Sequence, residues 1–532
     1  MEKFLKGKKS TQSSIVKKGL FVARQISYRH TFTNSICTFF SRITGVLKQN
    51  VISYLFGVAA DRFVASFRLV NAFRRYIGEG GALGNAFIPV FQEKMVKDGK
   101  EKAFLFASNI LNFFLLVTTG LTILLVVLIP AYFPFIVMGF KKGSIEYLET
   151  LYLYLIMLPY ITLICLFAIY MGILNSFKKF LASAVAPVVS NIIFIVFPIL
   201  THKRTGIYSL GLSVTIGVLA MILCQIFELK QIGFKYSFYL NLKDPELKKF
   251  FSLFFPTAGN MLFLTLKNLL TTSFLTFFAG GNIVMLNALM IVEAPLGIIS
   301  IAIGTVLMPV LSKLNSENQI ENFKKAIDEA INLLCYFMIP ISIFIIFFPD
   351  TVVNSVFRDI MMFFTGNTGK YTQQLLDKTY LATSIYSTGL FAMGATVIFE
   401  KIFYSLHDAK TPLKANVIVF LWSFIFYFSA FIPQVGIYGI FIADTIGAWL
   451  TYIYYRVIMN KKEKLQTKFS GKILILCGIS LLSVAITYPF YHFIYLRKYY
   501  PLISMSIAAI QLFLFSIIYY ILTKWLKMEL KR

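Results

Sequence analysis

Charged residues are scarce in this chain of 532 amino acids. They make up 14% of the sequence, whereas 58% of the residues are hydrophobic and 17% are aromatic. A soluble domain carries about 25% charged residues, so this composition, with a mean hydropathy of +0.73, excludes a water-soluble protein. Segments of about ten residues with alternating hydrophobicity are also absent, which excludes a membrane β-barrel.

The residues that build disulfides, metal centres and catalytic triads are few as well. All five cysteines lie inside predicted apolar helices and indicate neither a disulfide framework nor a zinc site. The four histidines are scattered over predicted helix ends and loops. The glycine-containing run at 366–370 lies in the longest predicted outward loop, near 356–378, and has the wrong spacing for a phosphate-binding loop. We therefore expect no metal, no catalytic residue and no ATP hydrolysis.

Long apolar runs dominate what the sequence does contain. Runs of about 18 residues or more recur along its whole length, and each can cross about 30 Å of hydrocarbon as a helix. The sequence therefore predicts an all-α integral membrane protein of about fourteen transmembrane helices. Residues 1–30 are basic and polar, without the apolar core of a cleavable signal, and we interpret them as a cytoplasmic tail.

The basic residues are distributed unevenly over the predicted loops. The chain has 51 Lys and Arg against 24 Asp and Glu, a formal net charge of +27. Most of the basic residues lie in the two tails and in the loops that face inward if the N-terminus is inside, such as the lysine-rich loop at 460–472. This pattern predicts that both termini are cytoplasmic. Because the charge is dispersed over short loops, nucleic-acid binding is not expected.

Two passages of the sequence look like copies of each other. Residues 84–91 resemble residues 304–311, and residues 174–176 resemble residues 403–405; each pair is six predicted helices apart. A six-helix duplication is typical of transporters whose two lobes rock about a central site. We therefore expect a cytoplasmic basic tail, an N-lobe, a cytoplasmic linker, a C-lobe and two extra helices with a cytoplasmic tail, at 1–30, 31–230, 231–247, 248–460 and 461–532.

The second predicted helix, near 61–91, carries the densest charge inside the membrane. At about 100° per residue, Asp61, Arg68, Arg75 and Glu79 lie within roughly 40° of one face. Each charge at mid-membrane costs about 2.5–3.5 kcal/mol, so such groups usually face a partner or a water-filled cavity. Further cations lie nearby in the sequence, at Arg42, Lys48, Arg62 and Arg74. Cations thus outnumber the two acids of this stretch.

Unpaired guanidinium groups suit a diphosphate, because their planar fork binds phosphate oxygens bidentately. An anionic substrate is the direct inference. The structural alternative is that Arg62 and Arg68 reach an interface by snorkelling and that Arg75 and Glu79 form an i,i+4 pair. A glycine-rich run at 78–81 weakens the same helix and indicates either a hinge or close helix packing.

Charged residues also lie within predicted helices of the second half of the chain, among them Lys267, Glu293, Glu400, Lys401 and Asp444. Intramembrane acids often bind a coupling cation or a proton. Asp444 is therefore a candidate for ion coupling. We expect no cofactor other than a coupling cation, or the membrane potential in its place, as the energy source for transport.

Several motifs closely match one known family. They are Ser-Arg-Ile-Thr-Gly at 41–45, Leu-Phe-Gly at 55–57, Asp61, Phe-Arg-Leu-Val-Asn at 67–71, Arg74, Arg75 and Glu79-Gly80. Shorter matches follow at 186–187, 293–295, 304–305, 311–313 and 410–412. In these motifs the chain resembles the MurJ (MviN) lipid II flippases. The first hundred residues carry the specific resemblance, whereas the last seventy match only in hydropathy and helix count.

The resemblance implies the fold of the MOP exporter superfamily. This fold has two six-helix lobes, a cationic cavity lined by helices 1, 2, 7 and 8, and a groove between helices 13 and 14 for a lipid tail. Arg42, Lys48, Asp61, Arg74 and Arg75 would correspond to charged cavity or structural positions of the family, with Lys48 in place of a usual arginine. The chain departs from the family pattern at three positions, Gln49, Val70 and Met290.

The resulting expectation is a flippase of the bacterial inner membrane, not an enzyme. It would move lipid II, the undecaprenyl-diphosphate-linked peptidoglycan precursor, from the inner to the outer leaflet by alternating access. This step would supply cell wall biogenesis and thereby maintain cell shape. Its partners would be this lipid or a related polyprenyl-diphosphate lipid and the surrounding membrane lipids, with association with the cell wall synthesis machinery left open. The alternatives are a flippase for another polyprenyl-linked oligosaccharide, a multidrug exporter of the same superfamily, and a membrane-embedded glycan polymerase or acyltransferase.

The candidate site residues fall into three groups. The expected substrate ligands are Arg42, Lys48, Arg68, Arg74, Arg75 and Lys267; the cavity or structural charges are Asp61, Glu79 and Glu293; the candidate for ion coupling is Asp444. The resemblance leads one to expect an arginine where the chain has Met290. We hypothesise that Lys267 supplies the missing charge to phosphate, and the alternative is that Lys267 pairs with Glu293 for structural reasons.

The charge distribution predicts the topology of the chain. Both termini and the loops at 92–102 and 460–472 should be cytoplasmic, because they carry the densest lysine clusters. Single cysteines introduced in these loops should react with an impermeant maleimide only after the cells are opened. Labelling of the 92–102 loop in intact cells would contradict the helix count or the orientation.

Overall fold

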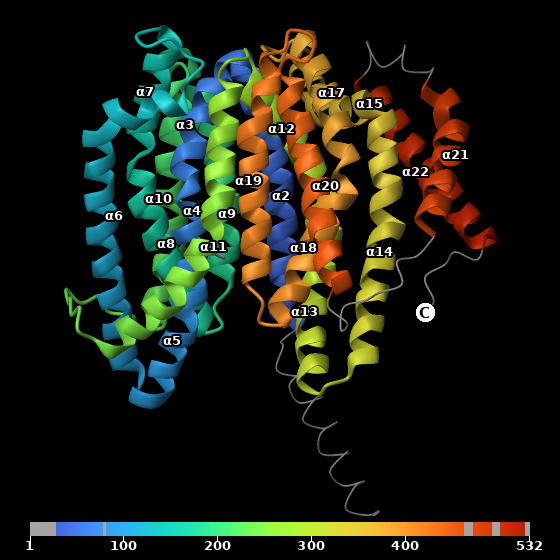
Figure 1. Cartoon of the computed structure of the whole chain (residues 1–532). Helices are drawn as coiled ribbons and strands as arrows, with labels where there is room; N and C mark the ends of the chain where they lie inside the picture. The colour runs from blue at the N-terminus through green and yellow to red at the C-terminus, as the bar shows by residue number, and fades with distance from the viewer. Residues whose placement is uncertain (1–27, 78–80, 462–471, 492–500, 527–532) are drawn as a thin grey trace, which may run out of the picture.

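The structure, a computed structural model, describes residues 28–77, 81–461, 472–491 and 501–526. Within these ranges all regular structure is helical, as the composition predicted. The helices stand side by side in one bundle, and their connections lie at its two ends (Figure 1).

The N-lobe consists of the helices before the linker. They are α2 (Tyr28–Phe56), η1 (Gly57–Ala59), α3 (Ala60–Ala72), α4 (Arg74–Ile77), α5 (Ala82–Asp98), α6 (Lys100–Ile136), α7 (Ile145–Met157), α8 (Pro159–Ser176), α9 (Leu181–Thr205) and α10 (Tyr208–Gln231). Helices α9 and α10 pack along each other, α9 also packs on α2, and α3 packs on α7.

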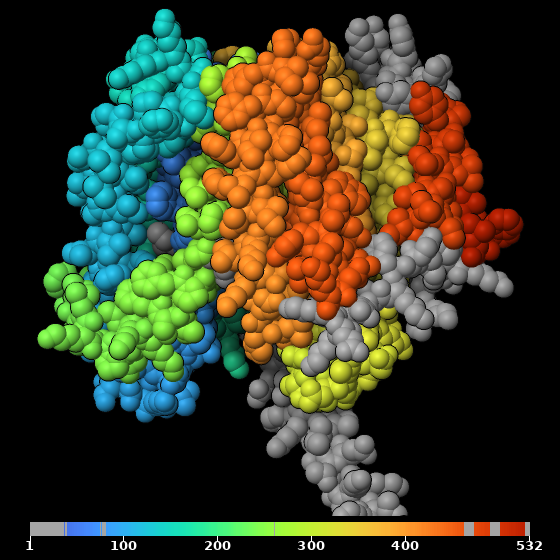
Figure 2. Space-filling model, in the orientation of Figure 1, coloured from blue at the N-terminus to red at the C-terminus, as the bar shows by residue number. Residues whose placement is uncertain are grey.

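The C-lobe and the two extra helices follow. They are α11 (Pro245–Leu275), α12 (Gly281–Pro295), η2 (Leu296–Ser300), α13 (Ile301–Ser316), α14 (Ile320–Phe347), α15 (Pro349–Val353), η3 (Asn354–Arg358), α16 (Asp359–Thr365), α17 (Gln373–Thr388), α18 (Leu390–Ser405), α19 (Lys410–Phe426), η4 (Tyr427–Phe431), α20 (Tyr438–Lys461), α21 (Lys472–Tyr491) and α22 (Pro501–Trp525). Helices α19 and α20 cover the face of the C-lobe seen in Figure 2.

Among the described residues, eight helices are long and apolar enough to cross a membrane, or nine if the bent pair α17 and α18 counts as one span. When helices that continue one another across short breaks are joined, the described helices form about fourteen rods near the predicted positions. The rods beyond the eight or nine apolar ones are too short, too broken or too charged to qualify as membrane spans by length and composition. The structure is therefore consistent with the predicted number of helices.

The two ends of the bundle differ in what they carry. We call the end with the α5–α6 turn and the linker 232–244 the linker end, and the end with the α6–α7 turn and the helices α15 and α16 the loop end (Figure 1). Helix α21 packs against α14 and α22, and α22 contacts α16. The two extra helices thus lie beside the C-lobe, at one edge of the bundle.

Two expectations about local structure were wrong. The helix predicted near 61–91 is interrupted at Phe73, between α3 and α4, and residues 78–80 of its glycine-rich run lie outside the described residues. The outward loop predicted at 356–378 is helical as far as Thr365, because the apolar stretch before Gly366 continues from η3 into α16. Gly366 then ends the helix with a positive φ of 76°.

The predicted repeat is visible in how corresponding helices end. Helices α8 and α18 close with the same cap, in which the amide of Lys179 donates to the carbonyl of Leu174 and the amide of Asp408 donates to the carbonyl of Phe403, both at 2.9 Å. The residue before each of these amides is left-handed, with φ of 58° and 57°. Both rods are also interrupted near their middle, at Leu158 and Gly389.

The lobes meet through backbone atoms at the loop end. The amide of Lys370 donates to the carbonyl of Tyr54 at 2.8 Å, and the amide of Gly139 donates to Thr276 Oγ1 at 2.8 Å. A Cβ atom at Gly369 would lie 2.5 Å from the carbonyl oxygen of Tyr54. Only a residue without a side chain permits this approach, so the loop after α16 lies directly on the end of α2.

The loop-end contact gives a mutational prediction. Gly369→Ala should separate the lobes there, because its Cβ would overlap the backbone of Tyr54 and its φ of 57° is unfavourable for alanine. We expect a Cys at position 53, where Ser53 is 1% exposed, to become reactive toward an impermeant maleimide.

The matched control is Gly366→Ala in the same loop. Its φ of 76° imposes the same kind of backbone strain, but no atom lies within 4 Å of the added Cβ. If both variants labelled equally, backbone strain and not the close approach would be responsible.

Candidate functional site

The cations of the N-lobe meet in a hollow between α2, α3, α4, α8, α9 and α10. Its lining includes Lys48, Arg74, Tyr160, Asn191 and Phe194, and its cavity volume is about 70 Å³. The Nζ atom of Lys48 lies 5.2 Å from the centre of the Phe194 ring, a cation–π contact. We call this hollow the cationic pocket.

No carboxylate is present among the residues that line the cationic pocket. Among the described residues, no acid lies within ion-pair distance of Lys48 or Arg74. The two cations are close enough for their charges to act on each other. A positive site held inside an apolar bundle without an acid is stabilised by an anion, so the geometry favours an anionic ligand.

Polar groups that can take part in binding surround the two cations. Tyr160 lies beside Arg74, and its hydroxyl also donates to Asn71 at 3.4 Å. The amide of Asn191 donates to the carbonyl of Ser41 at 3.1 Å, which ties α9 to α2. Sequence reasoning missed Tyr160, Asn191 and Phe194. In a chain with 17% aromatic residues, nothing in the sequence distinguishes these side chains from core residues.

Arg42 lies outside the pocket, where α2 approaches the C-lobe. Its side chain is exposed, and a Cβ on Gly297 would lie 2.9 Å from its Nη2 atom. The guanidinium therefore rests on the π-helical turn η2, at a glycine that leaves room for it. Arg75 belongs to α4, but its side chain is outside the described residues, as is the whole of Glu79.

Asp61 joins the two lobes. Its carboxylate is 4% exposed and accepts a hydrogen bond from the backbone amide of Ile283 at 2.8 Å, in the first turn of α12. A carboxylate is stabilised there by the free amides and the dipole of the helix N-terminus. In this conformation Asp61 therefore links α3 to α12, and its role as a cavity or structural charge stays a prediction.

Arg68 also crosses between the lobes and does not face the cationic pocket. Its Nη1 atom lies 3.3 Å from Thr272 Oγ1 and 3.1 Å from the sulfur of Met285. Glu293, on α12, is near enough for its charge to act on Arg68. Arg62 forms ion pairs with Glu146, at 3.3 Å, and Glu149.

Lys267, the cationic candidate in the C-lobe, already has a partner. The Nζ atom of Lys267 lies 2.7 Å from Oδ1 of Asp444, and the two side chains are 15% and 4% exposed. Sequence reasoning had weighed phosphate and Glu293 as its partners and had left Asp444 for a coupling ion. A role of Lys267 in phosphate binding therefore requires that this ion pair open.

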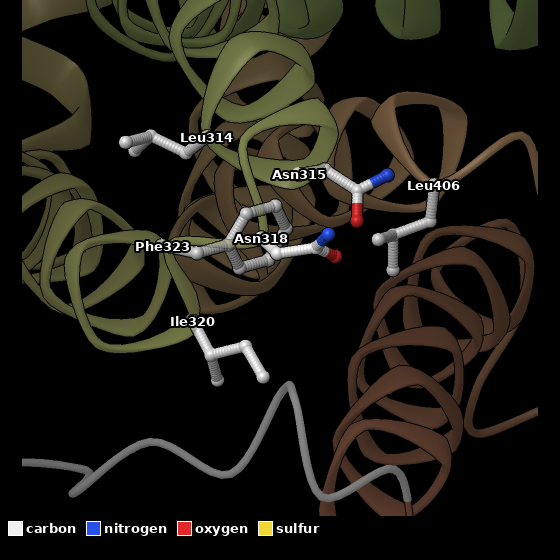
Figure 3. A pocket seen from close by; sticks show the side chains of 6 residues that line it. All are labelled: Leu314, Asn315, Asn318, Ile320, Phe323 and Leu406. Carbon is white, nitrogen blue, oxygen red and sulfur yellow. The ribbon is translucent and has the colours of Figure 1, made fainter.

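Two other hollows suit an anion less well. The hollow in Figure 3 lies at the turn between α13 and α14 and is lined by uncharged side chains: Leu314, Asn315, Asn318, Ile320, Phe323 and Leu406. The hollow between α5 and α11 at the linker end has balanced charges. There Lys94 pairs with Glu246 at 2.5 Å, and hydrogen bonds from Lys249 and Lys97 lower the pKa of Glu93 to about 2.

Comparison with known proteins identifies relatives over nearly the whole chain. The family model described as "Lipid II flippase MurJ" matches residues 52–527. The "Probable lipid II flippase MurJ" of Rickettsia prowazekii is 27% identical over 493 residues, which cover 91% of this chain and 94% of that protein. The "Lipid II flippase MurJ" of Burkholderia cenocepacia is 26% identical over 449 residues, which cover 82% and 84%.

Solved structures share the fold. The structure described as "Lipid II flippase MurJ, inward closed conformation" matches with a TM-score of 0.72 and 24% identity, over 93% of this chain and 99% of that one. An inward-facing multidrug resistance MATE transporter of the MOP superfamily matches with a TM-score of 0.62 and 16% identity, over 79% and 94%. The family model covers far more than half of the sequence, so the chain belongs to the lipid II flippase MurJ family.

Proposed function

We propose that the chain is a transporter that flips lipid II across the cytoplasmic membrane of a bacterium for peptidoglycan synthesis. The observation that supports this proposal most directly is the cationic pocket, in which Lys48 and Arg74 lie together without a carboxylate. The diphosphate of a polyprenyl-linked sugar has the charge and the oxygen atoms that such a pair binds. We infer that the particular lipid is lipid II from relatives that are described as lipid II flippases.

The contacts between the lobes suggest how the headgroup moves. At the loop end, backbone bonds and the Asp61 carboxylate hold the lobes together. At the linker end, ion pairs such as Lys94 with Glu246 join α5 to α11, and Phe114 of α6 packs edge-on against Phe250 of α11. We propose that the linker end faces the cytoplasm and admits the headgroup, and that the loop end opens to release it. The polyprenyl tail would remain in lipid beside α21 and α22.

The transport alternatives differ in the charge of their cargo. The MATE transporters share the fold with this chain at low identity, and that likeness carries no information about substrate. An exporter of organic cations favours acids in its binding site, whereas the lining of the cationic pocket has none. A flippase for another polyprenyl-linked oligosaccharide would use the same diphosphate chemistry. It remains the second candidate for the same pocket.

The pocket can be tested by removing one charge. Arg74→Leu should weaken binding of lipid II to the purified protein by about 10- to 150-fold, since a hydrogen bond to a charged group contributes about 1.5–3 kcal/mol. Binding can be measured by native mass spectrometry in detergent. Lys97→Leu is the control, because Lys97 is a 69% exposed cation outside the pocket. Equal binding by both variants would remove the pocket from the mechanism.

The remaining cations are tested by complementation. Arg42→Ala and Arg75→Ala should fail to support growth at normal membrane abundance, and Arg42→Lys should support it in part, because a lysine keeps the charge but loses the bidentate fork. Full growth with Arg42→Ala would show that the residue is dispensable.

The substrate is tested in cells. Depletion of the protein should lower the fraction of lipid II that is accessible from outside, as measured by cleavage with an externally added hydrolase. Unchanged accessibility, with another polyprenyl-linked sugar retained inside, would favour the second candidate.

A further inference from the structure

Asp444 lies in a cage of donors inside the C-lobe. The carboxylate, on α20, is 4% exposed. Its Oδ1 atom accepts from the Tyr427 hydroxyl at 2.5 Å and lies 2.7 Å from Lys267 Nζ. Its Oδ2 atom accepts from the Tyr386 hydroxyl at 3.0 Å. Both tyrosines are almost completely buried.

A second layer of oxygen atoms surrounds the same point. The hydroxyls of Thr271 and Tyr427 are 2.7 Å apart, and the Thr271 hydroxyl also bonds the carbonyl oxygen of Lys267 at 2.8 Å. Carboxylate, hydroxyl and carbonyl oxygens are the ligands that hard cations prefer. The cage thus has the chemistry of a site for a small monovalent cation, but a lysine ammonium occupies the position next to the carboxylate.

The ammonium and an alkali cation would compete for the same oxygen atoms. A carboxylate buried inside a membrane bundle requires a positive partner, and either cation would meet this requirement. The lysine is covalently tethered to α11, so its effective concentration at Asp444 exceeds that of any dissolved ion in ordinary buffers. As long as Lys267 keeps this position, Asp444 has no need of a sodium or potassium ion.

We propose that Lys267 is the resident counterion of Asp444, filling with the chain's own charge a site that would otherwise take a monovalent metal cation. The site joins α11 to α20, and Arg68 of the N-lobe bonds Thr272, the residue next to Thr271. The cage therefore sits close to the contact between the lobes. Its consequence for transport, which rests on the proposed function, is that movement of the lobes does not draw on a sodium gradient through Asp444.

The proposal is tested on the purified full-length protein without any lipid substrate, so its outcome is independent of what the protein transports. Thermal unfolding is compared in NaCl and in N-methyl-D-glucamine chloride at equal ionic strength. The wild type should unfold at the same temperature in both salts. Lys267→Met should unfold at a lower temperature in the organic salt and recover as NaCl is added, because sodium now reaches Asp444.

Two further variants make the result specific. Lys267→Met combined with Asp444→Asn should lose the response to sodium, because the carboxylate is gone. Lys249→Met removes a lysine from the same helix that is 49% exposed and pairs with Glu93, and it should show no sodium response. Direct binding of radioactive sodium should be absent from the wild type and present in Lys267→Met.

Two outcomes would overturn the proposal. One is saturable sodium binding by the wild type that Asp444→Asn abolishes, which would mean that the cage takes a dissolved ion despite Lys267. The other is a folded Lys267→Met protein that is indifferent to sodium. If Lys267→Met does not fold, the sodium-binding measurement on the wild type and on Asp444→Asn still decides.

Discussion

A charge inside a membrane bundle needs a partner, and the arrangement of this protein follows from how each buried charge finds one. Asp61 is stabilised by the first amides of α12 and Lys267 by Asp444, and in both cases the partner is far away in the sequence. Lys48 and Arg74 differ from these residues, since no acid lines the pocket in which they lie. These two cations, which no described acid neutralises, define the candidate binding site.

The fold was largely predictable from the sequence because membrane helices are specified by long, local apolar runs. The repeat was predictable from two short motifs, and the structure adds the shared caps after α8 and α18. The connections were less predictable. No strong local signal in the sequence marked the helix α16, which lies in a region predicted to be a loop.

The candidate site was predictable only in its residue types. Charge inside an apolar sequence identifies Lys48, Arg74, Lys267 and Asp444 as unusual residues. The sequence does not say which of them meet, because α11 and α20 are brought together by packing over the whole C-lobe. The alternative considered for Lys267, a pair with Glu293, named the acid that is nearer in the sequence. The more distant Asp444 is the one that lies at 2.7 Å.

The backbone contact at the loop end has a consequence for inhibition. Lys370 and Tyr54 meet through main-chain atoms, with Gly369 leaving no side chain between them. Substitutions of the neighbouring side chains therefore leave the hydrogen bond itself intact. A rigid cyclic peptide that offered its own amide to the carbonyl of Tyr54 would act as a wedge at the loop end. Resistance by exchange of a single side chain would be harder to acquire against such a molecule than against one that binds side chains.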